Sequence, residues 1–437
     1  MKKFLFILAF CPFLSNAQTI TRIAGNNSLG YSGDGGPATD AQLHQSYGIA
    51  IDAGSNVYVA DRVNSRIRKI DAATGIINTF VGDGTAGFSG DGGPASAARV
   101  NYPRGICFDH SKSNLYIADE YNQVIRKIDM TTGIITSVAG TGTSNGYSGD
   151  MGPATAARLF NPEDVILDGA GNLYIADYGN NVIRKVTAST GVISTAISGC
   201  PYGSGACFPR AIRLDNTEAL YVVEDESNHL RKKIWGKDTM QMIAGSSSLS
   251  LGDGGPATNA KLWGAVGIAI DPFNNIFIAD QNNHRVRKVD AMTGIISTIA
   301  GNGTMIFPHS GDIAASAPIP GPTSLTFDEA GNLYVSYAND LLKISNVFDP
   351  TTLVVKSQVA NNVNIFPNPG SGRFTVQQPN AEKYEMSIYN ILGEKVYQKH
   401  ATSANEYIDI SCQPEGIYFL HATSQVLNQR EKIVITR

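Results

Sequence analysis

The sequence predicts an all-β protein: a six-bladed β-propeller closed by its N-terminal strand, followed by a small C-terminal β-sandwich. Three observations support this fold class. A short apolar segment recurs six times, each copy belongs to a unit of four apolar segments separated by turns, and a different β pattern begins at residue 364. The 45 glycines and 18 tyrosines fit a protein of short strands and many turns.

The repeated segment first occurs as Asn-Val-Tyr-Val-Ala-Asp at 56–61. Copies or variants follow at 114–119, 172–177, 219–224, 275–280 and 332–337. Most of the steps between them are close to 57 residues, which is a suitable length for one blade of four antiparallel strands. Because a single blade cannot bury both of its faces, the copies are expected to stack around a ring.

The first unit shows how each blade is built. Its expected strands are 48–52, 57–61, 66–71 and 76–81. The segments between them carry Gly, Asn and Ser, which tolerate the backbone of tight turns and close them with local hydrogen bonds.

The two ends of the array predict ring closure. The sixth unit lacks an outer strand, and residues 20–25 (Ile-Thr-Arg-Ile-Ala-Gly) match 296–301, the outer strand of the fifth unit. An N-terminal strand that completes the last blade would remove an open sheet edge.

These repeats resemble a known family. Residues 171–186, Gly-Asn-Leu-Tyr-Ile-Ala-Asp-x-x-Asn-x-x-Ile-Arg-Lys-Val, are similar to the core of an NHL repeat. The resemblance extends over about residues 19–346, and five of the six copies keep most of it. The fourth copy departs, with Val223-Glu224-Asp225 in place of Ala-Asp and an additional basic residue in 231–233.

The tail, residues 364–437, has its own pattern of alternating apolar residues, which predicts a β-sandwich. Its motifs, including Ile365-Phe-Pro-Asn-Pro369 and Gly416-Ile-Tyr-Phe-Leu420, are similar to the type A sorting domain of the type IX secretion system. That resemblance implies export across an outer membrane and usually removal of the domain. An accessory adhesion sandwich is the alternative. Residues 347–363 are the expected linker, and 18–346 the propeller.

The N-terminus predicts a secretory signal peptide over residues 1–17. Lys2 and Lys3 precede the apolar run 4–14, and Ser-Asn-Ala at 15–17 provides small residues for cleavage. Cys11 would suit a lipoprotein site, but Phe10 is bulky where such a site needs a small residue. No other run is long enough to span a membrane. We therefore expect an exported protein that is secreted or attached to the cell surface.

Charge and cysteine content narrow the function further. The net charge is −4 with no basic stripe, which argues against nucleic-acid partners. The cysteine spacing fits no zinc site. Cys200 and Cys207 flank a turn-rich segment and form a candidate disulfide.

A polar turn, Asp-x-x-Asn followed by Arg, recurs in four blades. One interpretation is a ring of ligand-binding residues. The favoured one is structural: Asp and Asn close the hairpin, and Arg bonds a neighbouring blade. The residues are Asp61, Asn64, Arg68, Asp119, Asn122, Arg126, Asp177, Asn180, Arg184, Asp280, Asn283 and Arg287.

Glycine-rich connections recur at 30–38, 87–95 and 146–154, with a shorter form at 252–257. They could cradle an anion, or Asp34, Asp91 and Asp150 could bind calcium. Their spacing matches neither a P-loop nor a calcium loop, so packing against the blades is the favoured interpretation.

The best candidate for a ligand site is the mouth of the central channel, where the blades differ. The residues expected just before the innermost strands are Tyr47, Arg104, Glu163, Arg210, Val266 and Thr323. Arg104 and Arg210 could bind a carboxylate, phosphate or acidic sugar, with Glu163 ordering them. The alternative is an Arg–Glu–Arg salt bridge that plugs the channel.

We therefore expect a binding propeller that recognises a protein, peptide or glycan, with no cofactor, no metal and no catalytic residue evident in the sequence. The expected export partner is the type IX machinery. Two alternatives remain open: an extracellular enzyme of lactonase or lyase type that uses the channel mouth, and a structural adhesion component.

Overall fold

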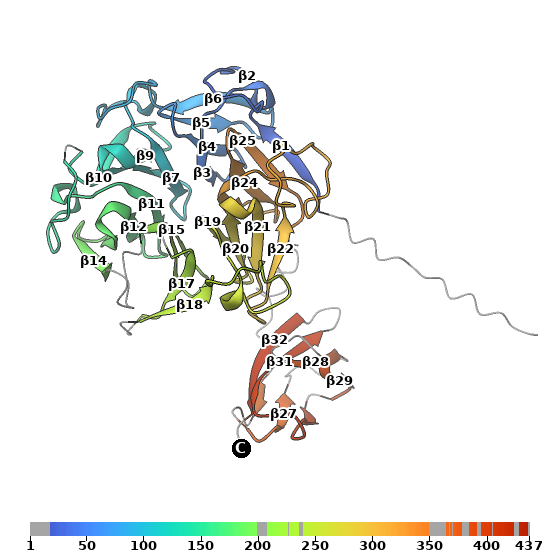
Figure 1. Ribbon diagram of the computed structural model, residues 1–437. Coiled ribbons are helices and arrows are strands. Elements are labelled where there is room, and N and C mark those ends of the chain that lie inside the picture. Colours follow the sequence, from blue (N-terminus) through green and yellow to red (C-terminus); the bar gives the residue numbers. More distant parts are fainter. Residues whose placement is uncertain are drawn as a thin grey trace, which may run out of the picture.

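The computed structural model describes residues 18–142, 144–198, 208–225, 227–235, 239–348, 364–366, 368, 370–377, 384–390, 395–403, 405–423 and 428–435. These residues form six antiparallel blades arranged in a ring, and two C-terminal sheets of three and four strands (Figure 1). The predicted signal peptide, Cys200, Cys207 and all of the predicted linker after residue 348 lie outside the described residues.

Each blade has four main strands, whose order from the channel outward follows the chain in the first five blades, and the short strand β2, Gly36–Pro37, adds a fifth to blade one. Blade one contains β3 Ser46–Ile51, β4 Val57–Asp61, β5 Arg66–Ile70 and β6 Ile76–Val81, and blade two contains β7 Pro103–Phe108, β8 Asn114–Asp119, β9 Val124–Asp129 and β10 Ile135–Ala139. Blade three contains β11 Pro162–Leu167, β12 Leu173–Asp177, β13 Val182–Val186 and β14 Ile193–Ser198, and blade four contains β15 Pro209–Leu214, β16 Leu220–Glu224, β17 His229–Lys233 and β18 Met240–Ala244. Blade five contains β19 Ala265–Ile270, β20 Ile276–Asp280, β21 Arg285–Val289 and β22 Ile296–Ala300, and blade six contains β23 Pro322–Phe327, β24 Leu333–Tyr337, β25 Asp340–Ile344 and β1 Ile20–Ala24.

The innermost strands begin earlier than the sequence predicted. In blade one, β3 starts at Ser46, which pairs with Asp61 at the end of β4, and the register then shifts before Ile49. The prediction took the apolar run from residue 48 as the whole strand and missed the paired residues on the other side of this irregularity. The predicted mouth residues are therefore the second residues of the innermost strands, and not the residues before them.

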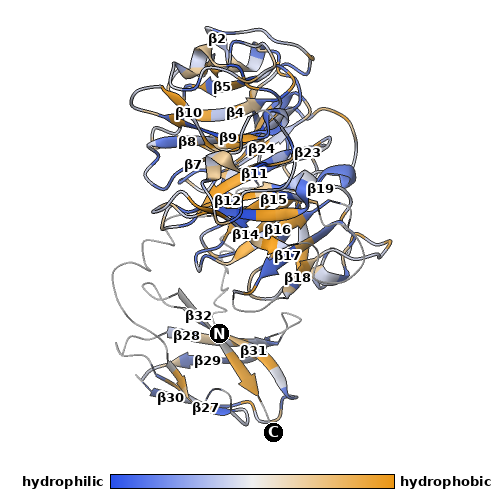
Figure 2. Ribbon diagram, turned by 90° about the vertical axis from the view of Figure 1, so that its left-hand side faces the viewer, coloured by the Kyte–Doolittle hydropathy of each residue, from blue (hydrophilic) through white to orange (hydrophobic). Residues whose placement is uncertain are grey.

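The core lies between neighbouring blades, where branched and aromatic side chains from adjacent sheets pack together. Tyr58 of β4 meets Phe80 and Phe108 edge to face, with ring centroids 5.1 and 5.3 Å apart. Hydrophobic residues line the strands in each visible blade (Figure 2). The innermost strands approach so closely that a Cβ at Gly105 would lie 2.7 Å from Asp164 Cα, so only glycine fits there.

The ring closes through its N-terminal strand, as predicted. β1 pairs with β25 in antiparallel register, with Ile20 opposite Ile344 (Figure 1). The other edge of β1 is also bonded: the Ile20 N–H donates to Asp312 O at 3.0 Å, and the Gly311 N–H donates to Ile20 O at 2.8 Å. This strand is therefore held on both sides.

The glycine-rich connections cover the outer edges of four blades. The short strand β2, Gly36–Pro37, pairs with β6, and Pro94, Pro153 and Pro256 form the matching bridges on the outer edges of blades two, three and five. Each connection continues into a short 3₁₀ helix: η1 Ala38–Asp40, η2 Ala95–Ala97, η4 Ala154–Ala156 and η6 Ala257–Asn259. Because bonded edges cannot recruit another strand, these connections protect the sheets from edge-to-edge association.

The C-terminal residues form two sheets that share one apolar core. One contains β26 Asn364–Phe366, β27 Arg373–Gln377 and β30 Asn405–Asp409; the other contains β28 Tyr384–Asn390, β29 Lys395–Ala401, β31 Gly416–Thr423 and β32 Asn428–Ile435. Phe374, Met386 and Ile408 are buried in this core. Among the described residues, no helix is long and apolar enough to cross a membrane.

Candidate functional site

The repeated polar turn has a structural role in each blade that keeps it. In blade one, Asp61 accepts hydrogen bonds from the His44 N–H and the Asn64 amide, both at 2.8 Å, and lies 3.4 Å from the Arg68 guanidinium. Asp61 and Arg68 are fully buried. The other three copies are built in the same way: Asp119, Asn122 and Arg126; Asp177, Asn180 and Arg184; Asp280, Asn283 and Arg287.

The arginines of these turns bind the glycine-rich connections. Arg68 lies 2.5 Å from Asp34, and Arg126 lies 2.7 Å from Asp91. The matching pairs are Arg184 with Asp150 and Arg287 with Asp253. Each arginine holds the connection that leads into its own blade, whereas the sequence had suggested a bond to a neighbouring blade. The carboxylates proposed as calcium ligands are therefore committed to arginines, and the described residues hold no group of three or more metal-ligating side chains.

A collar of six residues with left-handed backbone surrounds the mouth. Each residue immediately precedes an innermost strand: Gln45, Tyr102, Asn161, Phe208, Gly264 and Gly321, with φ between 41° and 63°. This conformation costs little for glycine and is strained for bulky residues such as Tyr and Phe. Blades one to four have a side chain at this position, whereas blades five and six have glycine.

Polar side chains hold this collar from the preceding blade. Asn181 Oδ1 accepts from the Phe208 N–H at 2.8 Å, and His284 Nδ1 accepts from the Gly321 N–H at 3.0 Å. Gln123, Asn228 and Asn339 accept in the same way from Asn161, Gly264 and Gln45. These contacts fix the position of the mouth relative to both neighbouring blades.

At the mouth, Arg104 of β7 and Glu163 of β11 form an ion pair between blades two and three. Both are buried, and burial raises the pKa of Glu163 to about 7, although the charges of Arg104 and Arg210 act in the opposite direction. Burial lowers the pKa of Arg104, but Glu163, Tyr47 and Glu120 together raise it by more, so the net shift is upward. One nitrogen, Arg104 Nη2, and one oxygen, Glu163 Oε2, have no hydrogen-bond partner.

The second predicted arginine, Arg210, has a different partner. Its Nη2 lies 2.6 Å from Asp225, which also accepts from the Tyr178 hydroxyl at 3.0 Å. Burial lowers the pKa of Arg210, but the combined effect of Glu163 and Asp225 raises it by a larger amount, so the net shift is upward. Of the predicted Arg–Glu–Arg bridge, only the Arg104–Glu163 ion pair is present, because Arg210 pairs with Asp225 instead.

A third charged pair lies between blades one and two. Arg62 makes a two-pronged contact with Glu120, with hydrogen bonds of 3.0 to 3.1 Å. Its guanidinium also lies over the ring of Tyr102, 4.7 Å from the centroid. Tyr102 stacks on Tyr121 with centroids 4.6 Å apart, and 47% of Tyr121 remains exposed.

The remaining predicted mouth residues are less available. The Thr323 hydroxyl is buried and bonded to Ser46 O at 2.8 Å and to Ser336. Val266 is buried. Tyr47 packs over Arg104, with the guanidinium carbon 4.6 Å from the ring centroid. The structure therefore brings Tyr47, Arg104 and Glu163 together and assigns Thr323 to internal packing.

Sequence reasoning missed Arg62, Glu120 and Asp225. All three occupy the position directly after the acidic residue that ends the second strand of a blade. That position varies around the ring, where it holds Arg62, Glu120, Tyr178, Asp225, Gln281 and Ala338. The same rule that selected the mouth residues, variation within a repeat, would have identified this position.

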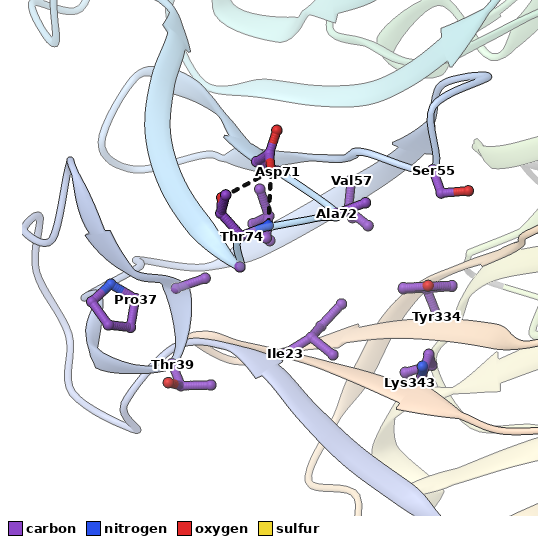
Figure 3. Close-up of a pocket in the computed structure, with 13 residues that line it drawn as sticks. Ile23, Pro37, Thr39, Ser55, Val57, Asp71, Ala72, Thr74, Tyr334 and Lys343 are labelled. Atoms are coloured by element: carbon purple, nitrogen blue, oxygen red, sulfur yellow. Dashed lines mark hydrogen bonds between the residues drawn. The ribbon is translucent and has the colours of Figure 1, made fainter.

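A cavity of about 490 Å³ lies away from the mouth, between blades six and one (Figure 3). Its walls include Ile23, Val57 and Tyr334, together with Lys343. The carboxylate of Asp71 at its rim accepts from the Thr74 N–H and hydroxyl at 2.9 and 2.8 Å. The polar groups at this rim thus serve the turn, and the cavity carries no cluster of reactive groups.

Comparisons with known proteins find matches in both parts of the chain. Residues 364–436 match the family model of the secretion system C-terminal sorting domain, and residues 27–87 match that of the teneurin NHL domain. Similar proteins include the chloroplastic protein SUPPRESSOR OF QUENCHING 1 of Arabidopsis thaliana, 28% identical over 64% of this chain and 28% of its own length. NHL repeat-containing protein 2 of Bos taurus is 25% identical over 73% of this chain and 47% of its own length. The chain therefore spans less than half the length of these relatives.

Solved structures share the fold. A protein of unknown function from Bacteroides thetaiotaomicron superimposes with a TM-score of 0.59 and 19% identity, covering 75% of this chain and 76% of that one. An auxiliary nutrient binding protein from the same organism gives a TM-score of 0.56 and 15% identity with the same coverage. At this level of identity the likeness establishes the architecture alone.

Proposed function

Since the chain carries an NHL-repeat propeller followed by a type IX secretion sorting domain, we propose that it is an exported or surface-displayed recognition protein that binds its ligand at the channel mouth. In this proposal residues 1–17 are the signal peptide, 18–346 the binding propeller, 347–363 the linker and 364–437 the export domain. The binding residues are Tyr47, Arg104, Glu163 and Arg210, with Arg62 and Tyr121 added from the structure.

The observation that carries this proposal is the unpartnered donor and acceptor at the Arg104–Glu163 pair. Buried polar atoms normally have partners, and those that lack one at a blade-specific position suggest a ligand group or water. The repeated arginines also leave Nε unpartnered, but they do so in four blades alike, as expected of a structural feature. Arg104 and Glu163 occur in one blade each.

A binding role is also consistent with the auxiliary nutrient binding proteins that share the fold. In the four blades that carry them, the Asp-x-x-Asn and Arg residues of the turns and the glycine-rich connections are repeated with little change, whereas the mouth residues differ from blade to blade. When the scaffold residues are repeated in the blades but the mouth residues differ between them, the mouth is suited to recognise one ligand at the propeller axis.

The test compares the full-length protein with the double variant Arg104→Gln/Glu163→Gln, which keeps the size of Glu163, shortens the side chain at 104 and removes both charges. Each is immobilised and exposed to extract of the spent growth medium. We expect the wild type to retain a component that the variant does not. The control is Arg99→Gln/Asp83→Asn, which removes an exposed ion pair with a 3.2 Å separation. Equal retention by all three proteins would contradict a site at the mouth.

An enzyme is the second candidate, and one observation favours it. Glu163 is a buried carboxyl whose pKa is raised to about 7, the range of a general acid or base. An enzyme predicts that Glu163→Gln retains ligand binding and abolishes conversion of the bound ligand. If the ligand retained by the wild type is recovered unchanged after prolonged incubation, the enzyme interpretation is wrong.

A further inference from the structure

The charges at the mouth are balanced in pairs. Arg62 faces Glu120 at 3.0 Å, Arg210 faces Asp225 at 2.6 Å, and Arg104 faces Glu163. An acidic ligand that bonded the free Arg104 Nη2 would place a second negative charge beside Glu163 and compete with this carboxylate for its cation. Removing one partner from a buried ion pair is strongly unfavourable. The mouth as built therefore suits a ligand without net charge.

Aromatic faces surround these pairs. Tyr102 and Tyr121 stack with an interplanar angle of 21°, and Tyr121 is half exposed. Tyr102 and Phe208 are held at φ of 57° and 41°, where bulky residues carry backbone strain. Strain of this kind persists where the surrounding structure enforces a side-chain position, and it is enriched at binding sites. The result is a rim of flat apolar surfaces presented beside polar groups.

The Arg104–Glu163 pair supplies one free donor and one free acceptor, Nη2 and Oε2. A hydroxyl group both donates and accepts, so neighbouring hydroxyls on one ring would satisfy both atoms. Tyr47 packs over Arg104 and is only partly buried, so its side chain has room to turn aside for a ligand. Sugar rings combine hydroxyl edges with faces of C–H groups that pack well on aromatic rings.

From these three features we propose that the mouth binds a neutral oligosaccharide, with a sugar ring stacked on Tyr121 and hydroxyls bonded to Arg104 and Glu163. This inference rests on the proposed function and adds the chemical class of the ligand. Peptides and acidic saccharides use different chemistry, and they are outcomes of the test below.

The experiment measures binding to the full-length protein by titration calorimetry. The neutral probes are maltoheptaose, cellohexaose and laminarihexaose. Trigalacturonic acid is the acidic probe and a tryptic digest of casein the peptide probe. We expect binding of at least one neutral probe, with an affinity that is unchanged between low and high salt because no net charge is neutralised. Tyr121→Ala should weaken this binding about ten-fold, since it removes the stacking face.

Controls separate loss of binding from loss of fold. Tyr407→Ala removes a tyrosine of similar exposure (59%) from β30 of the C-terminal sheets and should bind as the wild type does. Tyr121→Phe keeps the ring and should retain most of the affinity. Thermal unfolding of each variant verifies folding, and Tyr121→Leu provides a second variant that keeps apolar bulk without a flat ring.

Three outcomes would overturn the proposal. If only the acidic or peptide probe binds, and Tyr121→Ala abolishes it, the mouth is a binding site but not for neutral sugars. If a neutral probe binds equally well to wild type and Tyr121→Ala, the sugar site lies elsewhere. If none of the five probes binds, the ligand class is wrong, and the growth-medium comparison then decides whether the mouth binds anything.

Discussion

The Arg104 guanidinium and the Glu163 carboxylate form a buried ion pair that joins the innermost strands of blades two and three, and each keeps one polar atom without a partner. The pair thus connects two blades and also offers hydrogen-bonding groups that the protein itself does not use. Its two roles can be separated because stability and binding respond differently to single and paired substitutions.

Arg104→Gln should destabilise the protein more than Arg104→Gln/Glu163→Gln does. The single change leaves a buried carboxylate without its cation, at a cost of about 3 kcal/mol, whereas the double change leaves two neutral amides. Urea unfolding near pH 8, followed by fluorescence, measures both free energies of unfolding. Equal losses in the two variants would show that the pair does not act as a unit.

Glu163 should make the protein less stable as the pH rises. Its folded-state pKa of about 7 lies above the ordinary carboxyl value of 4.5, so the folded state holds this proton more tightly. Its stabilising contribution is full below about pH 4.5 and is lost as the pH rises through about 7. The difference of about 2.5 pKa units corresponds to about 3 kcal/mol.

Glu163→Gln should therefore flatten the dependence of the melting temperature on pH between about 4.5 and 7. A slope of the same sign should remain, because burial also raises the pKa of Asp119 to about 7 and that of Asp177 to about 6. If the variant keeps the full slope of the wild type, Glu163 does not titrate as the structure indicates.

Thr21→Pro should weaken ring closure more than Arg22→Pro. The N–H and C=O of Ile20 and the N–H of Arg22 bond residues 310–312 on one side of β1. Because the backbone groups of successive strand residues point to opposite sides, those of Thr21 are directed toward β25. Proline at 21 removes a donor of the sheet, while proline at 22 removes only the bond to Ser310 Oγ. Thermal unfolding and size-exclusion chromatography test this, and the reverse order of stability would contradict the assigned pairing.

Asn181→Gly tests the bond that holds the collar at Phe208. It removes the acceptor for the Phe208 N–H but keeps a residue that tolerates the φ of 58° at this position. We expect a loss of about 1 to 2 kcal/mol in the free energy of unfolding. Asn181→Ala should lose about 1 kcal/mol more, because alanine adds the cost of a left-handed backbone. Unfolding in urea compares them, and no loss in the glycine variant would show that this bond contributes nothing.

The fold could be predicted because each blade repeats the same pattern of four antiparallel strands separated by turns. The pattern at 56–61 predicted β4 with correct bounds, and the match between residues 20–25 and 296–301 predicted the closing strand. The beginning of β3 was missed because Ser46 and Tyr47 join the sheet across a register shift, which alternation of apolar residues does not reveal.

The site was predicted in part. The strand position of Arg104 and Glu163 follows from the repeat, so their meeting could be anticipated from sequence. The partner of Arg210 could not, because Asp225 belongs to the blade whose sequence departs most from the repeat. Arg62 and Glu120 were not predicted because they lie within the Asp-x-x-Asn turns, and the repeated Asp and Asn of these turns indicated a structural role for the whole segment.

The pairing of Ile20 with Ile344 also sets the order of folding. The contact joins residues 324 positions apart in the chain, so it can form only after the entire propeller has been synthesised. Contacts between such distant residues carry a large loop-closure entropy and form slowly. Until then β25 has no outer neighbour and the ring is open, so the unclosed chain remains the form most easily unfolded or cleaved. The residues that match the sorting domain follow the last blade, so they leave the ribosome only after closure has become feasible.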